Sequence, residues 1–536
     1  MQSSGLLSSI VAQMVSQSGI KVLIGSPGSR NAPLLDAFKR LDILDVKMII
    51  DERSAAFSAI GIADISENPV ALCCTSGSAL LNYAPALAEA YYRRIPLLVI
   101  TADRQSTRVN QGEPQTMLQP GSLSNVTVGC YEIEHNSSVI DAVTNINQAL
   151  CALRVSQRPV HLNIHLSEPL SLASDEQLTQ NYPLTEIIKA KPALSTSVMR
   201  QIGKRFSAPA KVLIYVGQMK PDNRLRKAIE RLKQFQNIAI LAEPISNLNT
   251  TNGIVYGVDA IMSTPSFTEK SELFVPDYLI TIGGVPTGRR FRQFIENYKS
   301  DIFHIHISPD ESIMDFYGAL RQWIVADEAT FMQQFASAMQ IYHRQSDYAS
   351  IWKSLEIPVS NRPEAVVIGQ ILQFTPKNFN ILLSNGLTIR MANRFIPTHH
   401  RYSANRGING IDGSTSTAIG ASEAYNMSTL LITGDTSALY DLSAWCNPLR
   451  SSRMKVIVID NGGGGIFRSI HPTKEMINRE ELVCCPQQQI NLGSVAEGCG
   501  WHVQTIEYDS DMSQYLKQFL NYISTSPSLL IIKINQ

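Results

Sequence analysis

Two polar residues in the C-terminal third of the chain each follow directly on a run of aliphatic residues. Asp435 ends "STLLITGD", and Asn461, 26 residues further on, ends "RMKVIVIDN". Both runs predict short buried strands, and the apolar spacing of "SALYDLSAWCNPLRSS" between them predicts a helix. Such a strand–helix–strand unit forms a parallel sheet, whose ligands bind at the carboxyl ends of the strands. We therefore expect Asp435 and Asn461 side by side at a binding edge.

A carboxylate beside an amide at such an edge is suited to a hard cation that carries a phosphate ligand. Mg²⁺ prefers about six oxygen ligands and often shares them with substrate phosphates. Asp435, Asn461 and the backbone carbonyl of Gly463, within the run Gly462–Gly465, would supply three of them. The ordinary alternative is a helix-capping Asp and an Asn-Gly turn, which is favoured for either residue alone. The paired placement favours a metal site.

The elements that position these residues repeat along the whole chain. Apolar runs such as "KVLIGSPG", "PLLVITADR", "KVLIYVG", "DYLITIGG" and "FNILLSNG" alternate with helical patterns, which is typical of doubly wound, mostly parallel sheets in an α/β protein. The apolar period weakens at 173–198, which we interpret as a linker, and it weakens again around 343–362. The sequence thus predicts three doubly wound domains over residues 1–182, 183–350 and 351–536.

Composition excludes several classes of function for a chain of 536 residues. Lys plus Arg and Asp plus Glu each number 46, so no net field gathers nucleic acid or an anionic membrane. The N-terminus lacks a basic region before its apolar positions and predicts an amphipathic helix rather than a signal peptide. No apolar run is long enough to span a bilayer, and we expect a cytoplasmic protein. The eight cysteines show neither metal-type spacing nor a disulfide framework, and the pairs 73–74 and 484–485 are expected to be buried thiols.

Several stretches together resemble one group of cofactor-dependent enzymes. The spacing of "GD" and "N" is similar to the diphosphate–Mg²⁺ motif of thiamine-diphosphate enzymes, although Thr436 and Gly462 replace its usual Gly and Asn. The stretches "GSPGSRNAPL", "DERSAAFSAIG", "EPQTMLQPG", "TGRRF" and "ANRGINGIDGSTSTAIG" narrow the resemblance. They resemble the family of 2-succinyl-5-enolpyruvyl-6-hydroxy-3-cyclohexene-1-carboxylate synthases of the menaquinone pathway, and the resemblance covers all three domains.

The resemblance implies a cofactor, a metal and a reaction. Thiamine diphosphate and Mg²⁺, with Mn²⁺ as an alternative ion, would be used to decarboxylate 2-oxoglutarate and to add the remaining succinyl unit to isochorismate. In the family the active sites lie between subunits, so we expect a homodimer, paired into a homotetramer. The implied cofactor contacts are Glu52, Ser29, Thr75, Ile411, Gly434, Asp435, Thr436, Ser437, Asn461, Gly463, Gly464, Ile466 and Phe467.

Glu52 ends the apolar run "VKMII" and begins a helical stretch rich in small residues. In thiamine-diphosphate enzymes a glutamate bonds the aminopyrimidine ring of the cofactor and assists its deprotonation, a role that needs a carboxyl group in a largely apolar pocket. The local sequence alone favours a solvated acid at a helix start. The match of "DERSAAFSAIG" to the family favours the catalytic role.

The implied substrates each carry two carboxylates, so we expect arginines in the site to bind them. A planar guanidinium binds a carboxylate at two points and stays charged when partly buried. By similarity, Arg390 and Arg406 hold 2-oxoglutarate, whereas Arg30, Arg104, Gln115 and Arg289 face isochorismate. Arg290 is a further site residue, to which the resemblance assigns no particular substrate. For any single arginine, a solvated surface charge is the ordinary alternative. Arg289 stands where the family commonly has Lys, and Gly386 stands where a substrate-contacting Ser is common, so we expect nearby Ser384 or water to replace that hydroxyl.

Two other functions remain open from the residues alone. One is a different thiamine-diphosphate carboligase or a simple 2-oxoacid decarboxylase of the acetolactate-synthase type, against which the arginine-bearing stretches argue. The other is a non-catalytic protein that binds a diphosphate ligand on the same fold. Glu52, Asp435 and Asn461 together argue against that function. A flavin in the central domain, found in some relatives, also remains open.

Overall fold

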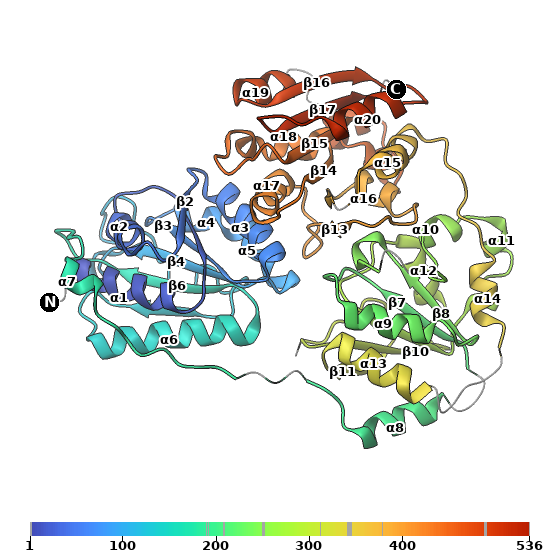
Figure 1. The fold of residues 1–536 in the computed structure, drawn as a ribbon, viewed down its shortest axis with the longest axis horizontal. Coiled ribbons are helices and arrows are strands. Elements are labelled where there is room, and N and C mark those ends of the chain that lie inside the picture. The colour runs from blue at the N-terminus through green and yellow to red at the C-terminus, as the bar shows by residue number, and fades with distance from the viewer. Residues whose placement is uncertain are drawn as a thin grey trace.

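A computed structural model describes residues 3–188, 190, 192–206, 210–248, 252–310, 312–339, 346–377, 379–486 and 490–534. The chain forms three lobes, each built around a parallel sheet with helices on both faces (Figure 1). This confirms the predicted α/β fold class, whereas the domain boundaries at 182 and 350 stay predictions. Among the described residues, no helix is both long and apolar enough to cross a lipid bilayer.

The N-terminal lobe contains a parallel sheet in the order β2-β1-β3-β4-β6-β5. Helices α1, α2 and α6 cover one face of it, and α3 and α5 cover the other. The strands are β1 Val22–Gly25, β2 Asp45–Met48, β3 Val70–Cys74, β4 Leu97–Asp103, β5 Cys130–Ile133 and β6 Val160–His165. The helices are α1 Ser4–Gln17, α2 Ala32–Leu41, α3 Glu52–Ser66, α4 Ala79–Asn82, α5 Ala84–Arg93, α6 Val139–Ser156 and α7 Asp175–Leu178.

The central lobe contains a parallel sheet in the order β11-β10-β9-β7-β8. Its strands are β7 Val212–Val216, β8 Ile238–Ala242, β9 Tyr278–Ile282, β10 Phe303–Ser308 and β11 Leu320–Val325. Its helices are α8 Thr196–Arg205, α9 Asn223–Leu232, α10 Val258–Ile261, α11 Pro265–Thr268, α12 Arg289–Asn297, α13 Glu328–Met339 and α14 Tyr348–Lys353. Helices α8, α9 and α13 pack on one face, while α10, α11, α12 and α14 pack on the other.

The C-terminal lobe contains a parallel sheet in the order β13-β12-β14-β15-β17-β16. Its strands are β12 Asn380–Leu383, β13 Arg401–Ser403, β14 Thr429–Gly434, β15 Met454–Asp460, β16 His502–Glu507 and β17 Ser528–Lys533. Its helices are α15 Pro363–Phe374, α16 Leu387–Ala392, α17 Ser414–Ala424, α18 Asp435–Tyr440, α19 Leu492–Gly498 and α20 Ser513–Asn521, and the 3₁₀ turns include η5 Leu442–Cys446 and η6 Gly465–Arg468. The predicted strand pair at Asp435 and Asn461 is confirmed, because β14 and β15 pair directly and in parallel. The helix predicted between them is divided into the short α18 and the 3₁₀ turn η5.

The N-terminal and C-terminal lobes meet where α3 packs on α17. A Cβ atom at Gly61 would lie 2.0 Å from the Thr417 carbonyl oxygen, and one at Gly420 would lie 2.0 Å from the Ser58 carbonyl oxygen. Only glycine allows backbones to approach this closely. A single apolar cluster runs from the first sheet through these two helices into the third sheet. The two sheets are therefore rigidly connected within one chain.

The cysteine predictions need two corrections. Cys446 in η5 and Cys499, just after α19, form a disulfide, whereas the spacing of the cysteines suggested none. The reason is a tertiary contact, since Trp501 donates from Nε1 to the Trp445 carbonyl oxygen at 2.9 Å and so draws the two segments together. Cys485 is exposed rather than buried, because it follows a short helical turn at the surface. The cysteines at 73, 74 and 484 are buried as expected.

Candidate active site

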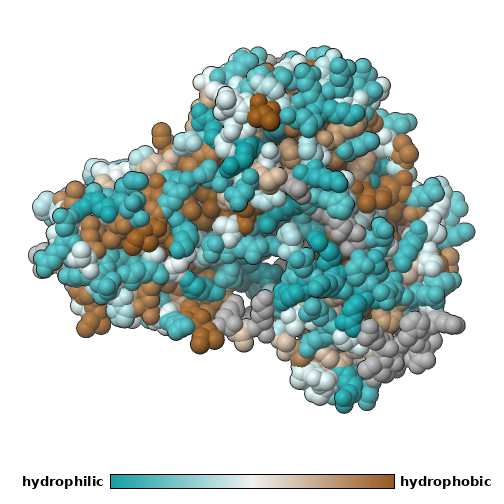
Figure 2. Space-filling view, viewed as in Figure 1, coloured by the Kyte–Doolittle hydropathy of each residue, from teal (hydrophilic) through white to brown (hydrophobic). Residues whose placement is uncertain are grey.

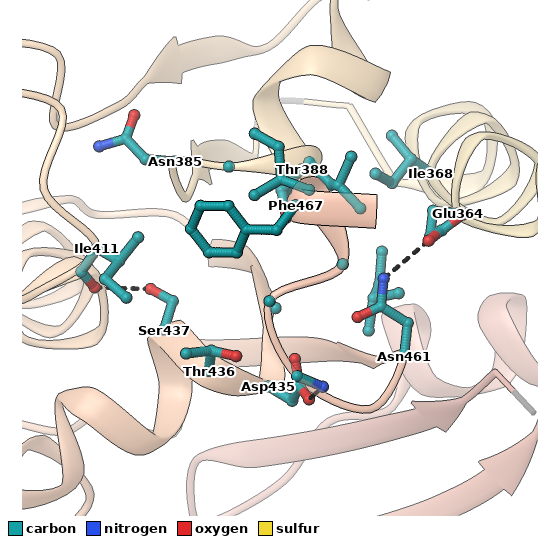
Figure 3. A pocket seen from close by; sticks show the side chains of 18 residues that line it. Glu364, Ile368, Asn385, Thr388, Ile411, Asp435, Thr436, Ser437, Asn461 and Phe467 are labelled. Carbon is teal, nitrogen blue, oxygen red and sulfur yellow. Dashed lines mark hydrogen bonds between the residues drawn. The ribbon is translucent and has the colours of Figure 1, made fainter. Parts of the chain in front are cut away.

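A cleft opens at the carboxyl ends of β12, β14 and β15 (Figure 3). It encloses about 650 Å³ of space, part of it open to solvent. The strand order reverses between β12 and β14, and ligands of doubly wound sheets bind at such a switch point. The lining residues are Glu364, Ile368, Asn385, Gly386, Leu387, Thr388, Ile411, Gly434, Asp435, Thr436, Ser437, Ile459, Asn461, Gly463, Gly464, Gly465, Ile466 and Phe467.

Asp435 begins α18 directly after β14, and a backbone amide holds its carboxylate. Oδ2 accepts a hydrogen bond from the Gly463 N–H at 2.6 Å. The pKa of Asp435 is raised to about 6, chiefly by burial and in addition by the neighbouring Asp460 carboxyl, while hydrogen bonds from backbone amides oppose the shift. A buried carboxylate close to another acid is stabilised by a cation. The electrostatics therefore fit a metal ligand at this position.

Asn461 follows β15 and is oriented by a residue that the sequence reasoning missed. Its Nδ2 donates to Glu364 Oε1 at 2.8 Å (Figure 3). Since the nitrogen points to Glu364, the amide oxygen is the atom that can serve as a metal ligand. Burial raises the pKa of Glu364, but hydrogen bonds from Arg362 and Asn461 outweigh it and leave that pKa below its usual value. Glu364 is thus a charged acceptor that fixes the Asn461 amide.

The glycine run between Asn461 and η6 has a shape that side chains would prevent. Gly463 has φ +104°, and a Cβ atom there would lie 2.4 Å from the Cys484 carbonyl oxygen. Its own carbonyl, a predicted metal ligand, accepts the Gly465 N–H at 2.7 Å and retains a second lone pair. Arg468 donates to the carbonyl oxygens of Asn461 and Gly462 at 2.9 and 2.7 Å. These contacts hold the loop in one conformation against Asp435.

The walls of the cleft combine one unpaired hydroxyl with apolar side chains. Thr436 Oγ1 is buried and has no hydrogen-bond partner in the part of the chain that the structure describes, although buried hydroxyls are normally paired. Ser437 donates to the Ile411 carbonyl oxygen at 2.8 Å, which fixes the loop that places Ile411 across from Phe467 (Figure 3). A diphosphate oxygen would satisfy Thr436, and the two apolar side chains would cover aromatic rings. The residues therefore fit thiamine diphosphate with a divalent cation.

Arg406 approaches the cleft through Asn385, another residue that sequence reasoning missed. Arg406 Nη1 donates to Asn385 Oδ1 at 3.0 Å, and Asn385 lines the cleft. Asn385 Nδ2 in turn donates to the carbonyl oxygens of Asn405 and Gly410, each at 2.6 Å. Burial lowers the pKa of Arg406, and the nearby charge of Arg390 lowers it further. The two predicted 2-oxoglutarate arginines therefore lie close enough to influence each other.

Glu89, from α5 of the N-terminal lobe, holds the same loop from the other side. Its two carboxylate oxygens accept the N–H groups of Gly407 and Ile408 at 2.8 and 2.9 Å. Burial raises the pKa of Glu89, while Arg93 and these amides lower it. No signal in the sequence distinguishes Glu89 or Asn385 from an ordinary helix or loop residue, because both act through partners far away in the chain.

The expectation that Ser384 replaces the hydroxyl missing at Gly386 needs a correction. It has φ +91° and precedes α16, a conformation that strains any residue with a side chain. Ser384, the expected substitute, is buried and donates to Thr388 Oγ1 at 3.3 Å, and it does not line the cleft among the described residues. Thr388 lines the cleft instead. The glycine is explained by backbone geometry, and of the two hydroxyl-bearing residues that lie two positions from it, Thr388 is the one that lines the cleft.

The arginines of the N-terminal lobe gather at the carboxyl ends of β1 and β4. Arg30 is 4% exposed and pairs with Glu168 at 2.6 Å. Arg104 pairs with Glu113 at 3.1 Å and lies 4.0 Å from Glu168. Glu168 therefore joins the two arginines that were predicted to face isochorismate. An incoming dicarboxylate would compete with these acids for the guanidinium groups.

The remaining predicted residues of this lobe surround the same edge. A Cβ atom at Gly28 would lie 2.3 Å from Thr75, so Thr75 packs against the loop that carries Ser29. Gln115 lies against Gly77, 3.3 Å from the position of a Cβ there. Glu52 begins α3 and accepts a hydrogen bond from Asn82 at 3.1 Å. Among the described residues, all that line the cleft belong to the C-terminal lobe, so Glu52, Ser29 and Thr75 lie outside it.

Arg289 and Arg290 begin α12 in the central lobe, and both side chains are exposed. Their backbone N–H groups donate to the Asp259 carboxylate at 3.2 and 2.8 Å, which fixes the start of the helix. Thr287, just before them, accepts a hydrogen bond from Asn393, the residue after α16. The two exposed guanidiniums thus stand on a helix that is tied to the lobe containing the cleft.

Comparison with known proteins identifies two thiamine-pyrophosphate-binding domains in the chain and several synthases similar to it. Residues 7–123 match the thiamine pyrophosphate enzyme N-terminal TPP binding domain, and residues 386–532 match the corresponding C-terminal TPP binding domain. A 2-succinyl-5-enolpyruvyl-6-hydroxy-3-cyclohexene-1-carboxylate synthase from Porphyromonas gingivalis is 32% identical over 95% of this chain and 91% of its own length. The chain belongs to this synthase family. A synthase of the same name from Flavobacterium psychrophilum is 34% identical over 88% of this chain and 86% of its own length. Another, from Bacteroides fragilis, is 31% identical over 96% of this chain and 92% of its own length.

Membership of the synthase family confirms the predicted enzyme class, a thiamine-diphosphate-dependent transferase, and its cofactor. The structure brings ten of the predicted contact residues together in one cleft, and they are Ile411, Gly434, Asp435, Thr436, Ser437, Asn461, Gly463, Gly464, Ile466 and Phe467. Among the described residues, Arg390, which is exposed on α16, and Arg406 do not line that cleft, and neither do the predicted contacts of the N-terminal and central lobes. Their individual roles stay predictions.

Proposed function

We propose that the chain decarboxylates 2-oxoglutarate and adds the remaining succinyl unit to isochorismate. The products are 2-succinyl-5-enolpyruvyl-6-hydroxy-3-cyclohexene-1-carboxylate and CO₂, a step of menaquinone biosynthesis. One observation carries the proposal. The cleft that contains Asp435 and Asn461 is also lined by Asn385, which binds the Arg406 guanidinium at 3.0 Å. A metal–diphosphate site therefore adjoins a fixed cation suited to a dicarboxylate substrate.

The residues divide into a cofactor-holding set and a substrate-holding set. Asp435, Asn461 and the Gly463 carbonyl would hold Mg²⁺ or Mn²⁺, and Thr436 would bind a diphosphate oxygen. When bound, thiamine diphosphate supplies the electron sink for decarboxylation. Arg390 and Arg406 would orient the carboxylates of 2-oxoglutarate beside it and raise its effective concentration. The apolar walls at Ile466 and Phe467 exclude water, which strengthens these charge interactions.

The acceptor substrate would be held by the N-terminal and central lobes. Arg30 and Arg104 already converge on Glu168, and Gln115 lies on the loop that follows Arg104 in the chain. Arg289 and Arg290 are exposed at the start of α12. Two carboxylates of isochorismate would find guanidinium partners among these side chains. Glu52 would act on the cofactor as the proton-transferring carboxylate of the site.

Because Glu52 does not line the cleft of its own chain, we propose that it completes the cleft of a second subunit. Apolar side chains near Glu52 are exposed, with Ile50 at 83% and Leu81 at 43%, and apolar surface gathers over the N-terminal lobe in Figure 2. Exposed apolar patches of this kind mark subunit interfaces. The assembly would be a homodimer, paired into a homotetramer, and we place it in the cytoplasm.

The direct experiment follows isochorismate consumption by the purified chain with 2-oxoglutarate, thiamine diphosphate and Mg²⁺, omitting each component in turn. The proposal predicts consumption and a succinylated product only in the complete mixture. If the chain binds the cofactor but leaves isochorismate unchanged while converting other 2-oxoacids, the proposal is wrong, and a different carboligase or decarboxylase of the same fold is the answer.

A further inference from the structure

Three potential metal ligands meet at the end of the N-terminal sheet, away from the cleft. β5 and β6 are neighbouring parallel strands, with Glu132 opposite Asn163 in the register. Glu132 and Glu134 are two positions apart on β5 and its extension, and so point to the same face. His165 is the last residue of β6. One ligand atom from each of these three side chains lies within 4.8 Å of the others.

The distances suit an ion between the three side chains. His165 Nε2 lies 3.4 Å from Glu132 Oε2 and 3.8 Å from Glu134 Oε1. Ligands of a tetrahedral zinc ion with bonds of about 2.0–2.2 Å lie roughly 3.4 Å apart. Ser106 donates to the other oxygen of Glu134 at 3.1 Å and thereby directs Oε1 towards the histidine. A small rotation of Glu134 completes the geometry.

The position of the His165 ring follows from a chain of hydrogen bonds that begins at a backbone amide. The Gly77 N–H donates to Gln119 Oε1 at 2.8 Å, so the Gln119 amide nitrogen donates to Asn163 Oδ1, also at 2.8 Å. Thr101 donates to the same oxygen at 2.6 Å. The Asn163 nitrogen must therefore face Asp103 Oδ2 at 3.0 Å.

The same nitrogen lies 3.3 Å from His165 Nε2. Nε2 also lies 3.4 Å from Glu132 Oε2, within hydrogen-bond distance of that carboxylate. The other ring nitrogen, Nδ1, donates to the Arg104 carbonyl oxygen at 2.5 Å. Metal-binding histidines commonly donate from one nitrogen to a carbonyl in this way, while the other nitrogen presents its lone pair to the metal.

A ring nitrogen that faces two carboxylates at 3.4 and 3.8 Å requires a cation between them, which is either a proton on the ring or a metal ion. His165 is 1% exposed, so solvent does little to screen its ring. Among the described residues, the ion-pair partners of Glu132 and Glu134 are histidines alone, and neither acid is neutralised by Lys or Arg. The acids themselves are accessible, with side chains 44% and 38% exposed, which gives an ion a path from solvent.

We propose that His165, Glu132 and Glu134 form a second metal site, which takes Zn²⁺. One imidazole nitrogen and two carboxylate oxygens, with water in the fourth position, suit zinc better than Mg²⁺, which favours an all-oxygen shell. The site is distinct from that at Asp435 and Asn461, because it lies on the N-terminal sheet. It holds the Arg104 backbone through Nδ1 and so anchors the loop that begins with this arginine.

The test is a zinc titration of the full chain, saturated with thiamine diphosphate and millimolar Mg²⁺, followed by calorimetry. Wild type is expected to bind one Zn²⁺ per chain. The double variant E132Q/E134Q is expected to weaken this binding by more than about tenfold, since even outer partners of metal ligands contribute that much. E176Q is the matched control, because Glu176 is an exposed acid on α7 of the same lobe, and it should bind zinc as wild type does.

Cobalt gives a second readout, since Co²⁺ held by a histidine and carboxylates at low coordination number gives visible absorption. That absorption is expected in wild type and E176Q and not in E132Q/E134Q. Equal zinc binding by wild type and E132Q/E134Q would overturn the proposal and would place the ion at cysteines or at the Mg²⁺ site. No zinc uptake by wild type would overturn it as well, and would mean that a proton on His165 pairs with the acids. Unchanged melting of the variants without zinc shows that they are folded.

Discussion

The N-terminal and C-terminal sheets have the same strand order but different chemistry at their carboxyl ends. The orders β2-β1-β3-β4-β6-β5 and β13-β12-β14-β15-β17-β16 are equivalent strand for strand. In the C-terminal sheet, the strands β14 and β15 are followed by Asp435 and Asn461, beside an open cleft. In the N-terminal sheet, the equivalent strands β3 and β4 are followed by Thr75 and Arg104, and ion pairs occupy this edge.

The comparison shows that strand order decides where a site can form, whereas the residues after each strand decide what it binds. The glycine run after β15 leaves space for a diphosphate, while the Arg30–Glu168 pair fills the corresponding edge of the first sheet. The C-terminal edge is thus built for binding a cofactor and its metal. The N-terminal edge carries the guanidinium groups that we propose for an anionic substrate, and Glu52, which we propose acts on the cofactor.

The largest effects are expected for variants of Asp435 and Glu52, which should distinguish the loss of cofactor binding from the loss of catalysis. Asp435→Asn should remove Mg²⁺-dependent binding of thiamine diphosphate and lower activity by at least about 100-fold, because a charged metal ligand is lost. Glu52→Gln should lower activity to a similar extent but leave cofactor binding intact. Cofactor titration and isochorismate consumption measure the two effects. The exposed Asp509, changed to Asn, is the control and should behave as wild type.

Changes to the arginines should separate the two substrates. Arg406→Lys should raise the KM for 2-oxoglutarate by about 10- to 100-fold, because one charge-assisted two-point contact contributes about 1.5–3 kcal/mol. Arg104→Lys should raise the KM for isochorismate instead. Steady-state kinetics with each substrate varied in turn measures both. If both variants change the KM of the same substrate, the assignment of one substrate to each edge fails.

A smaller effect is expected for the residue that orients Asn461. Glu364→Ala should weaken Mg²⁺ binding by about tenfold, as is common when a partner of a metal ligand is lost. Glu364→Gln retains an acceptor oxygen for Asn461 Nδ2 and should recover most of the affinity. Mg²⁺ titration of activity provides the measurement. A purely structural role for Glu364 would instead lower the melting temperature of both variants without changing Mg²⁺ affinity.

The smallest effect is a pH dependence from Asp435. Its folded pKa is raised from 3.8 to about 6, so the protonated form is favoured on folding, and the resulting stability is lost as the pH rises through 6. The metal-free protein should therefore melt at lower temperature at pH 7 than at pH 5, after comparison with Asp435→Asn at each pH. Mg²⁺ with the cofactor should reverse this trend. Identical pH profiles for the metal-free wild type and Asp435→Asn would contradict the assignment.

Much of the fold could be predicted from the sequence, and the strands that were missed share one physical property. β5, β11, β13 and β16 are all at sheet edges, where one side of the strand meets solvent and the continuous apolar run is lost. Three of them, β5, β11 and β16, are largely half-buried or exposed along their length, whereas β13 has only three residues, too few for a recognisable apolar run. The central strands, buried on both faces, gave the long aliphatic runs that identified them.

The candidate site likewise contains some residues that could be predicted from the local sequence and others that could not. Asp435, Asn461 and the glycine run could be predicted because strand ends and loop glycines leave a local signal. Glu364 and Asn385 could not, because each acts through a partner distant in the chain: Glu364 bonds Asn461, and Asn385 bonds Arg406. A helix-initiating Glu and a loop Asn are too common for their types alone to indicate these contacts.

The central claim is that the edge at Glu52 and the edge at Asp435 work together across two chains. Co-expression of Glu52→Gln and Asp435→Asn chains with different affinity tags tests it most directly. Each variant alone should be inactive. In random mixtures half of the dimers are mixed, and in each of these one of two sites has both residues, so about a quarter of wild-type activity should return. Mixed dimers without isochorismate consumption would contradict the account and place both residues in a site within one chain.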